Sequence, residues 1–258
     1  MKVIVDIGTN PNLIKIDVAD VLLHHFLKYY RNLGVTEFIL HGNDTIINAI
    51  KPVYKDFYNI NFVPINTEKY LEYTKRDCNI FKKLKEQGLL ELYHKLGCGC
   101  NVLPEWLIQN DLKRQYLSED ELCFILDLDE FVELSATELK LINDSDVQYC
   151  RGVMVDRIGY SSNGPVSLSK DIDIFKQLDQ QIDITKKIGN RATNKIMITR
   201  GHLESCFGHH GLYKKSDILD KKSWSKTLNV WHCKYFKQNI EGGLGSHGIK
   251  EQEYFKKT

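Results

Sequence analysis

The sequence lacks any hydrophobic run long enough to cross a membrane. Its longest apolar stretches, such as Val18 to Leu23 and Leu122 to Leu126, are far shorter than the roughly 20 residues that a transmembrane helix needs. The first residues also lack the charged and apolar regions of a secretory signal peptide. We therefore expect a soluble, cytoplasmic protein with no transmembrane segment, for which peripheral association with a membrane stays open.

Net charge is also nearly absent. The 35 Lys and Arg residues balance 34 Asp and Glu residues, which leaves a formal charge of +1 at pH 7. So small a charge produces no global field that would draw the chain to nucleic acid or to an anionic membrane. We expect no nucleic-acid partner, and any recognition of phosphate has to come from a local group of residues.

The chain has no regular set of paired cysteines. Seven cysteines are an odd number and are scattered, which argues against a secreted disulfide framework and for reduced thiols. Only Cys98 and Cys100 lie close together, and with His94 they hint at zinc. Because no second Cys or His pair stands at ligand spacing, a tight glycine loop with buried or idle thiols is the better interpretation.

What the sequence does contain is typical of a globular protein. Its 258 residues are 42% hydrophobic and 27% charged, so the chain can bury a substantial core. No internal repeat, low-complexity tract or sharp change of composition divides it. We predict one domain over residues 1–240, with halves at 1–133 and 134–240, followed by a flexible, glycine-hinged tail over 241–258.

Strand and helix patterns alternate along the chain. Strands are predicted over residues 1–7, 37–43 and 61–65, and near 147–157, 195–199 and 228–232. Helices are predicted over 17–33, 44–57, parts of 67–117 with a new start after Pro104, and 136–142, and a flexible turn over 161–165. Strand, helix and strand with short connections indicate parallel βαβ units. The expected fold is α/β, with a mixed, mainly parallel sheet flanked by helices.

The most informative segment runs from Cys123 to Val132. Apolar, strand-favouring residues there end in three carboxylates, Asp127, Asp129 and Glu130, and acids this dense repel one another unless a cation lies between them. In an extended strand, Asp127 and Asp129 would aim at one ion while Leu128 packs into the core and Glu130 faces elsewhere.

Hard oxygen ligands of this kind suit Mg²⁺ or Mn²⁺. The alternative is a pair of solvated acids in a turn that follows a strand. Two further Asp-x-Asp pairs lack an apolar strand before them, and we expect both in exposed loops. They are Asp144 with Asp146, and Asp171 with Asp173.

Several motifs together resemble glycosyltransferases of the GT-A fold. In chain order they are Phe38-Ile39-Leu40, residues 125–131, Val155-Asp156-Arg157, Gly208-His209-His210 and residues 230–235. Over residues 17–236 the chain is similar to the family-2-like and family-92-like group that carries an Asp-x-Asp-Glu-Phe motif. The resemblance implies a Rossmann-like GT-A domain with a nucleotide-binding first half and an acceptor-binding, site-completing second half.

The same resemblance implies an activity. A sugar would move from a nucleoside-diphosphate sugar donor to a hydroxyl of a glycan or lipid-linked saccharide acceptor, with inversion, in the synthesis of surface glycans or polysaccharides. A metal ion, Mn²⁺ or Mg²⁺, would neutralise the charge that builds on the departing diphosphate.

Individual residues receive roles from the resemblance. Asp127, Asp129 and His232 would bind the metal, and an imidazole ligand favours Mn²⁺ over Mg²⁺. Asp127, Lys195 and Lys234 would contact the donor. The catalytic base stays open between Asp156, Glu204 and His210. Without the family context, His232 would be a core histidine, Lys234 a surface charge, and Asp156 an ion-pair partner of Arg157.

Two other functions remain as alternatives. The Asp-x-Asp motif superficially resembles that of haloacid-dehalogenase-like phosphatases, in which the first Asp is a nucleophile. That family carries the motif on its first strand, whereas Asp127 lies in the middle of this chain. A non-catalytic protein that binds a nucleotide sugar is the second alternative, because a fold alone does not guarantee turnover.

Overall fold

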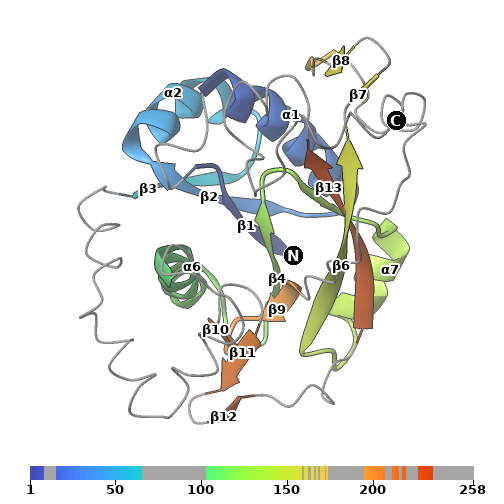
Figure 1. The fold of residues 1–258 in the computed structure, drawn as a ribbon. Helices are drawn as coiled ribbons and strands as arrows, with labels where there is room; N and C mark the ends of the chain where they lie inside the picture. Colours follow the sequence, from blue (N-terminus) through green and yellow to red (C-terminus); the bar gives the residue numbers. More distant parts are fainter. Residues whose placement is uncertain are drawn as a thin grey trace.

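The structure, a computed structural model, is built around one eight-stranded sheet (Figure 1). It describes residues 1–8, 16–65, 103–158, 160–161, 164–165, 167, 169–171, 173, 195–206, 211–214, 217–218 and 226–234. The large sheet contains β1 (Lys2–Asp6), β2 (Glu37–Asn43), β3 (Ile60–Ile65), β4 (Leu122–Asp127), β5 (Glu130–Val132), β6 (Tyr149–Ile158), β9 (Lys195–Arg200) and β13 (Lys226–Lys234). The helices are α1 (Ile16–Asn32), α2 (Asp44–Tyr54), α6 (Leu103–Tyr116) and α7 (Ala136–Asn143).

The strand order is β3-β2-β1-β4-β9-β6-β13-β5. Strands β3, β2, β1 and β4 are parallel to one another. Strand β9 is antiparallel to β4 and β6, and β5 is antiparallel to β13. The predicted α/β class, with a mixed and mainly parallel sheet flanked by helices, is confirmed.

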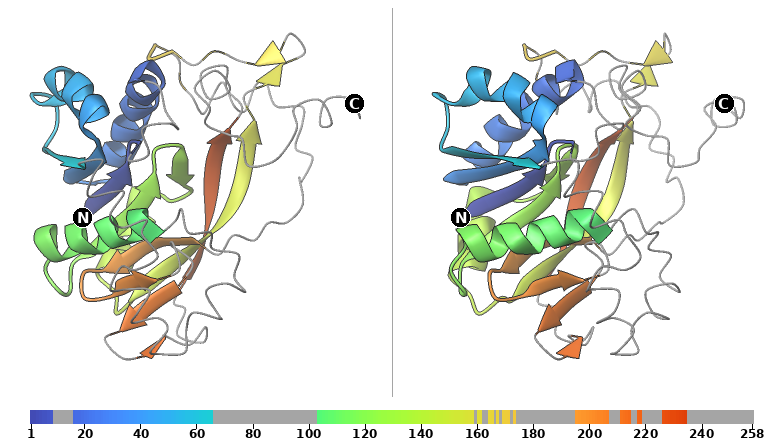
Figure 2. Two further views of the ribbon diagram at one scale, coloured as in Figure 1. Left: turned by 60° about the vertical axis from the view of Figure 1, so that its left-hand side comes forward. Right: turned by 90° about the vertical axis from the view of Figure 1, so that its left-hand side faces the viewer.

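Helices cover both faces of the parallel part of the sheet (Figure 2). On one face, Val3, Val5, Phe38 and Leu40 pack with the apolar side chains of α1 and α2. Alternate residues of a strand point to opposite faces, so Ile4, Ile39 and Ile125 form a second core on the other face. That second core includes Ile108 and Leu112 of α6. The apolar periodicity of the sequence thus accounts for both layers.

The parallel strands reverse their spatial order beside β1. From β1 the chain builds β2 and then β3 on one side, and it later returns to place β4 on the other side of β1. In an open α/β sheet, such a reversal leaves a crevice outside the carboxyl ends of the two strands that flank it. This places Asp6 at the end of β1 and Asp127 at the end of β4 at the edge where α/β proteins commonly bind ligands.

The sheet has to curl to accommodate the link between β4 and β5. Only Leu128 and Asp129 separate the two strands along the chain, yet β9, β6 and β13 lie between them in the sheet. Four strand spacings in a flat sheet are about 19 Å, whereas the three steps from Asp127 to Glu130 span at most about 11 Å. Figure 1 shows the resulting twist, with β6 and β13 running steeply beside β4 while β2 and β3 lie nearly crosswise.

Where the structure describes them, the predicted elements mostly recur with small shifts at their ends, while the helices expected within 67–102 and the tail over 241–258 lie outside the described residues. The expectation of an extended strand through Asp129 is wrong, because Leu128 and Asp129 form a turn between β4 and β5. The described residues of the predicted turn over 161–165 belong to a short antiparallel pair of strands, β7 (Tyr160–Ser161) and β8 (Gly164–Pro165).

A small second sheet follows β9, and periodicity did not predict it. It consists of β10 (Glu204–Cys206), β11 (Gly211–Lys214) and β12 (Asp217–Ile218). The buried Lys113 of α6 donates a hydrogen bond from Nζ to the carbonyl of Leu203, just before β10. These strands are too short for an alternating pattern to stand out from the surrounding loops.

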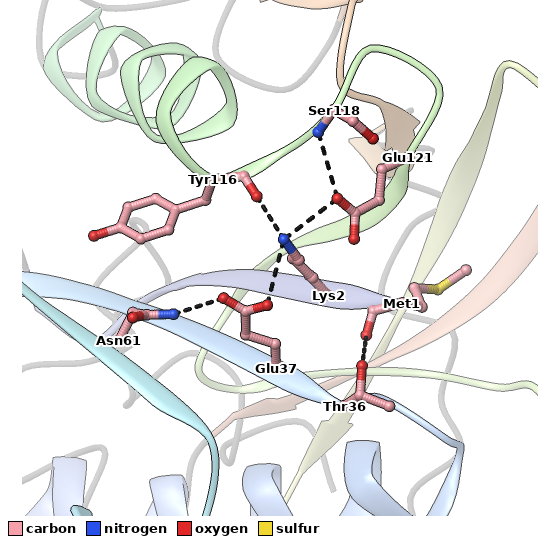
Figure 3. Close-up of polar contacts among 8 residues, drawn as sticks. All are labelled: Met1, Lys2, Thr36, Glu37, Asn61, Tyr116, Ser118 and Glu121. Carbon is pink, nitrogen blue, oxygen red and sulfur yellow. Dashed lines mark hydrogen bonds and ion pairs between the residues drawn. The ribbon is translucent and has the colours of Figure 1, made fainter.

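An ion-pair network joins the amino ends of the parallel strands (Figure 3). Lys2 Nζ lies 3.3 Å from carboxylate oxygens of both Glu37 and Glu121, and it donates a hydrogen bond to the carbonyl of Tyr116 at 2.6 Å. Burial acts to lower the pKa of Lys2, but the two glutamates outweigh it and raise that pKa above its ordinary value. The network fastens the strand ends opposite the crevice.

A short segment around Ser169 crosses over α1. His25 Nε2 donates a hydrogen bond to the carbonyl of Ser169 at 2.8 Å, and Lys170 Nζ lies 2.6 Å from Asp20 Oδ2. The hydroxyl of Tyr54 in α2 also donates to Asp20, at 2.9 Å from Oδ1. Polar contacts therefore connect α1 both with α2 and with a segment distant in sequence.

This contact predicts a pH dependence of stability. Burial is the main cause that lowers the pKa of His25, so the folded protein favours the neutral ring. His25 of the unfolded chain takes up a proton near pH 6.5. The stability that the buried, neutral His25 contributes is therefore fully present above that pH and is lost as the pH falls toward and through the lower pKa of the folded protein. Lowering the pH from about 7.5 to about 5 should reduce the free energy of unfolding, measured with urea, more in the wild type than in His25→Gln. Equal losses would contradict this assignment.

Within the described ranges, no helix combines the length and the apolar character that crossing a bilayer requires.

Candidate metal and nucleotide site

Three polar residues line up across the carboxyl ends of neighbouring parallel strands. The register pairs Asp6 of β1 with His41 of β2 on one side and with Asp127 of β4 on the other. Each lies two residues beyond Ile4, Ile39 and Ile125 respectively, so the row continues the face that α6 covers. It lies at the edge of the sheet where the strand order reverses.

His41 is the buried member of this row. Its side chain has no exposed surface, and burial lowers its pKa against the opposing effect of the Asp6 and Asp127 carboxylates. Asp6 and His41 belong to none of the motifs that predicted the site. Their position at the ends of two predicted parallel strands was the available signal. The order of the strands in the sheet is needed to show that the two residues are neighbours.

The loop after β1 is anchored at the same edge. Gly8 has φ 113°, a backbone conformation that glycine adopts without strain, and its N–H donates to Asp6 Oδ1 at 2.8 Å. Asn43 donates from Nδ2 to the carbonyl of Gly8 at 2.7 Å. Its Oδ1 accepts from the N–H of Ile46 and caps the start of α2. Neighbouring backbone is thus held in place beside Asp6.

The acidic motif forms a closed turn. The N–H of Asp127 donates to Glu130 Oε2 at 2.8 Å, and the Glu130 residue is only 1% exposed. Leu128 packs into the core as predicted, with 4% exposure. Glu130 was expected to face away from the ion, on the assumption of an extended strand. Its carboxylate instead folds back and fixes the backbone of the motif.

Asp129 and His232 face each other across the seam between the turn and β13. His232 Nε2 lies 3.3 Å from Asp129 Oδ2, and both side chains are 16% exposed. The N–H of Cys233 donates to the carbonyl of Asp129 at 2.8 Å, so the backbone of β13 holds the turn directly. The sequence separates these two residues by about a hundred positions, and the structure brings them together.

The remaining predicted site residues fall in different places. Asp156 lies on β6 directly opposite His232 in the backbone register, and Lys234 lies two residues further along β13, opposite Ile158. Lys195 begins β9, opposite Gly152. The side chains of Asp156, Lys234 and Lys195 lie outside the described part of the structure, as does all of His210.

Glu204 is placed away from this group. It lies on β10, just after the end of β9, and Arg200 at that end pairs with Leu122 at the start of β4. Asp127 stands at the opposite end of β4. The structure therefore brings Asp129, His232 and the backbone of Asp156 together and leaves the backbone of Glu204 at the other end of the β4–β9 pair. None of the three candidate bases is established.

The donors present fit a hard divalent cation whose coordination a substrate completes. Asp129 and His232 supply an oxygen and a nitrogen that already approach each other. In the described ranges, no group of three or more His, Cys, Asp or Glu side chains is gathered closely enough to hold an ion. Mg²⁺ and Mn²⁺ are commonly held by one or two carboxylates, with waters and substrate phosphates as the other ligands.

The two other Asp-x-Asp pairs serve as an internal comparison. Their four carboxylate residues, Asp144, Asp146, Asp171 and Asp173, are all exposed, as predicted. The motif at Asp127 and Asp129 differs from them because it follows a buried strand and faces a histidine of another strand.

No protein-family model matches the sequence, and the search of curated proteins gives no match either.

Proposed function

We propose that this protein is a GT-A-like, metal-dependent glycosyltransferase that moves a sugar from a nucleoside-diphosphate sugar to a hydroxyl of a glycan or lipid-linked saccharide. The observation that carries the proposal is the 3.3 Å approach of Asp129 to His232, beside the edge where the order of the parallel strands reverses. Nucleotides bind at such edges in α/β sheets.

We assign each residue a role from its position in the fold. Asp129 and His232 would hold Mn²⁺ or Mg²⁺, which when bound neutralises negative charge on a departing diphosphate. Glu130 fixes the N–H of Asp127 and so orients the turn that carries Asp129. Asp6 and Asp127, at the ends of adjacent strands, stand where carboxylates can accept hydrogen bonds from ribose hydroxyls.

Lys195 and Lys234 are proposed donor contacts, since an ammonium group pairs with phosphate oxygens. The backbone of the candidate base Asp156 pairs directly with His232 in the register of β6 and β13. General-base catalysis would require its carboxylate to reach the acceptor hydroxyl on the face opposite the leaving diphosphate.

Calorimetric titration with a panel of nucleoside-diphosphate sugars tests this proposal. We expect one donor to bind in the presence of Mn²⁺ and to bind much more weakly after EDTA treatment, because the ion bridges protein carboxylate and diphosphate. Free nucleoside diphosphates provide the control for recognition of the sugar. The proposal would be rejected if no donor bound under any of three conditions: with Mn²⁺, with Mg²⁺ or without a metal ion.

A further inference from the structure

Strand β5, which directly follows Asp129, is the last strand on its side of the sheet that the described residues form. Its pairing with β13 uses the backbone groups of alternate residues. The carbonyl of Asp129 accepts from the N–H of Cys233 at 2.8 Å, and the N–H of Glu133 donates to the carbonyl of Asn229 at 2.8 Å. In an antiparallel pair the intervening residues point their backbone groups the other way. The groups of Glu130 and Val132 therefore face outward, away from β13.

Two adjacent tyrosines of α1 bind these outward-facing backbone groups. The hydroxyl of Tyr30 donates to the carbonyl of Glu130 at 2.9 Å and accepts from the N–H of Val132 at 3.0 Å. The hydroxyl of Tyr29 donates to the carbonyl of Val132 at 2.7 Å. Three outward-facing backbone groups of β5 are thus bound by side chains of one helix.

The tyrosine rings are themselves fixed by aromatic packing. Tyr30 has no exposed surface, and its ring stacks on Phe131 with the centroids 6.4 Å apart and 12° between the planes. Tyr29 meets Phe131 edge-on at 5.4 Å. Because both tyrosine rings pack against Phe131, their hydroxyls have little freedom to move with a shifted strand. The position of β5 is therefore set by α1 as well as by β13.

We propose that Tyr30, assisted by Tyr29, is a positioning residue for the metal site. Its hydroxyl holds the backbone from Glu130 to Val132, and through that backbone it sets where Asp129 stands relative to His232. It also sets where the Glu130 carboxylate meets the N–H of Asp127. This inference rests on the proposed function, since it assigns Tyr30 to the site that would bind the ion.

The test compares variants that each lose one tyrosine hydroxyl. Tyr30→Phe removes both hydrogen bonds to β5 and keeps the ring. Tyr54→Phe is the matched control, because that buried tyrosine also bonds through its hydroxyl, but to Asp20 between α1 and α2. The probe is Mn²⁺ alone, with free Mn²⁺ measured by electron paramagnetic resonance well below the melting temperature of each variant.

We expect Tyr30→Phe to raise the Kd for Mn²⁺ by about tenfold, a typical effect of losing a group that orients a ligand. Tyr54→Phe should keep the wild-type Kd although it also lowers the melting temperature. Equal Kd values for the wild type and Tyr30→Phe would overturn the inference while leaving the proposed function in place. A wild type that binds no Mn²⁺ would overturn the inference, whereas the calorimetric panel of donors decides the proposed function separately.

Tyr29→Phe covers the case in which Tyr30→Phe does not fold. It removes one hydrogen bond, to the carbonyl of Val132, and retains both bonds of Tyr30. We expect a smaller rise in Kd, of about threefold, a fraction of the usual effect of losing an outer-shell contact. An unchanged Kd in this variant would overturn the inference.

Discussion

Asp129→Asn is expected to lower metal-dependent turnover by about 10³-fold. The substitution keeps the size of the side chain and removes the charge that faces His232. A bound cation that neutralises a leaving diphosphate contributes several kcal/mol to transition-state stabilisation, and a loss of about 4 kcal/mol corresponds to this factor. The measurement is the rate of nucleoside-diphosphate release from the donor identified by calorimetry, at saturating Mn²⁺.

Asp146→Asn provides the control for this substitution. Asp146 belongs to an Asp-x-Asp pair of the same spacing and is exposed, so its replacement changes the net charge equally without touching the site. Its turnover should match that of the wild type. If Asp129→Asn retained turnover within about twofold of the wild type, a change of less than 0.5 kcal/mol, Asp129 would not be a metal ligand.

Phe131→Ala is expected to lower the free energy of unfolding by about 3–5 kcal/mol, the usual cost of removing a buried aromatic ring. Phe131 has no exposed surface, and its ring contacts Phe26, Tyr29 and Tyr30 of α1. The cavity would lie between α1 and β5, directly beside the turn that carries Asp129. Urea unfolding followed by circular dichroism measures the change.

Phe57→Ala is the matched control for the loss of a phenyl ring. Phe57 follows α2 and is 69% exposed, so its removal should change the free energy of unfolding by no more than about 0.5 kcal/mol. Similar losses for Phe57→Ala and Phe131→Ala would mean that the aromatic cluster between α1 and β5 does not stabilise the fold as the structure indicates.

The parallel core could be predicted from the sequence because burial on both faces leaves a strong local pattern. Strand β4 reads as an apolar run, and α1 repeats its apolar residues at helical spacing. Local pattern also predicted the end of α1, where Gly34 has φ 98° as expected for a residue just after a helix. Elements of this kind depend on their own residues more than on distant partners.

The turn at Leu128 and Asp129 could not be predicted in the same way. Phe131 and Val132 continue the strand-favouring composition of β4, and the acids before them left a turn only as the alternative to an extended strand. The break follows from the curl of the sheet, which brings β5 next to β13 instead of extending β4. The inward fold of Glu130 is a consequence of that turn and was missed for the same reason.

Some residues of the candidate site lie in motifs that the sequence shows. Others come together only through the order of the strands in the sheet, which the sequence does not show. The proximity of Asp129 and His232 agrees with the ligand pair that the resemblance implied. Asp6 and His41 have no motif around them, and their alignment with Asp127 appears only when β1 is placed between β2 and β4. Tyr29 and Tyr30 likewise read as ordinary residues of an amphipathic helix until their hydroxyls are seen to bind the backbone of β5.

The most direct test of the proposed activity is an incubation of the protein with the nucleoside-diphosphate sugar panel and Mn²⁺, without acceptor, followed by ³¹P nuclear magnetic resonance. We predict slow, Mn²⁺-dependent release of an intact nucleoside diphosphate from one donor, because water replaces the missing acceptor hydroxyl, and no such release by Asp129→Asn. Release of inorganic phosphate or of a nucleoside monophosphate would indicate hydrolysis at phosphorus, and no reaction with any donor would indicate a protein that only binds. Either result would contradict the proposed sugar transfer.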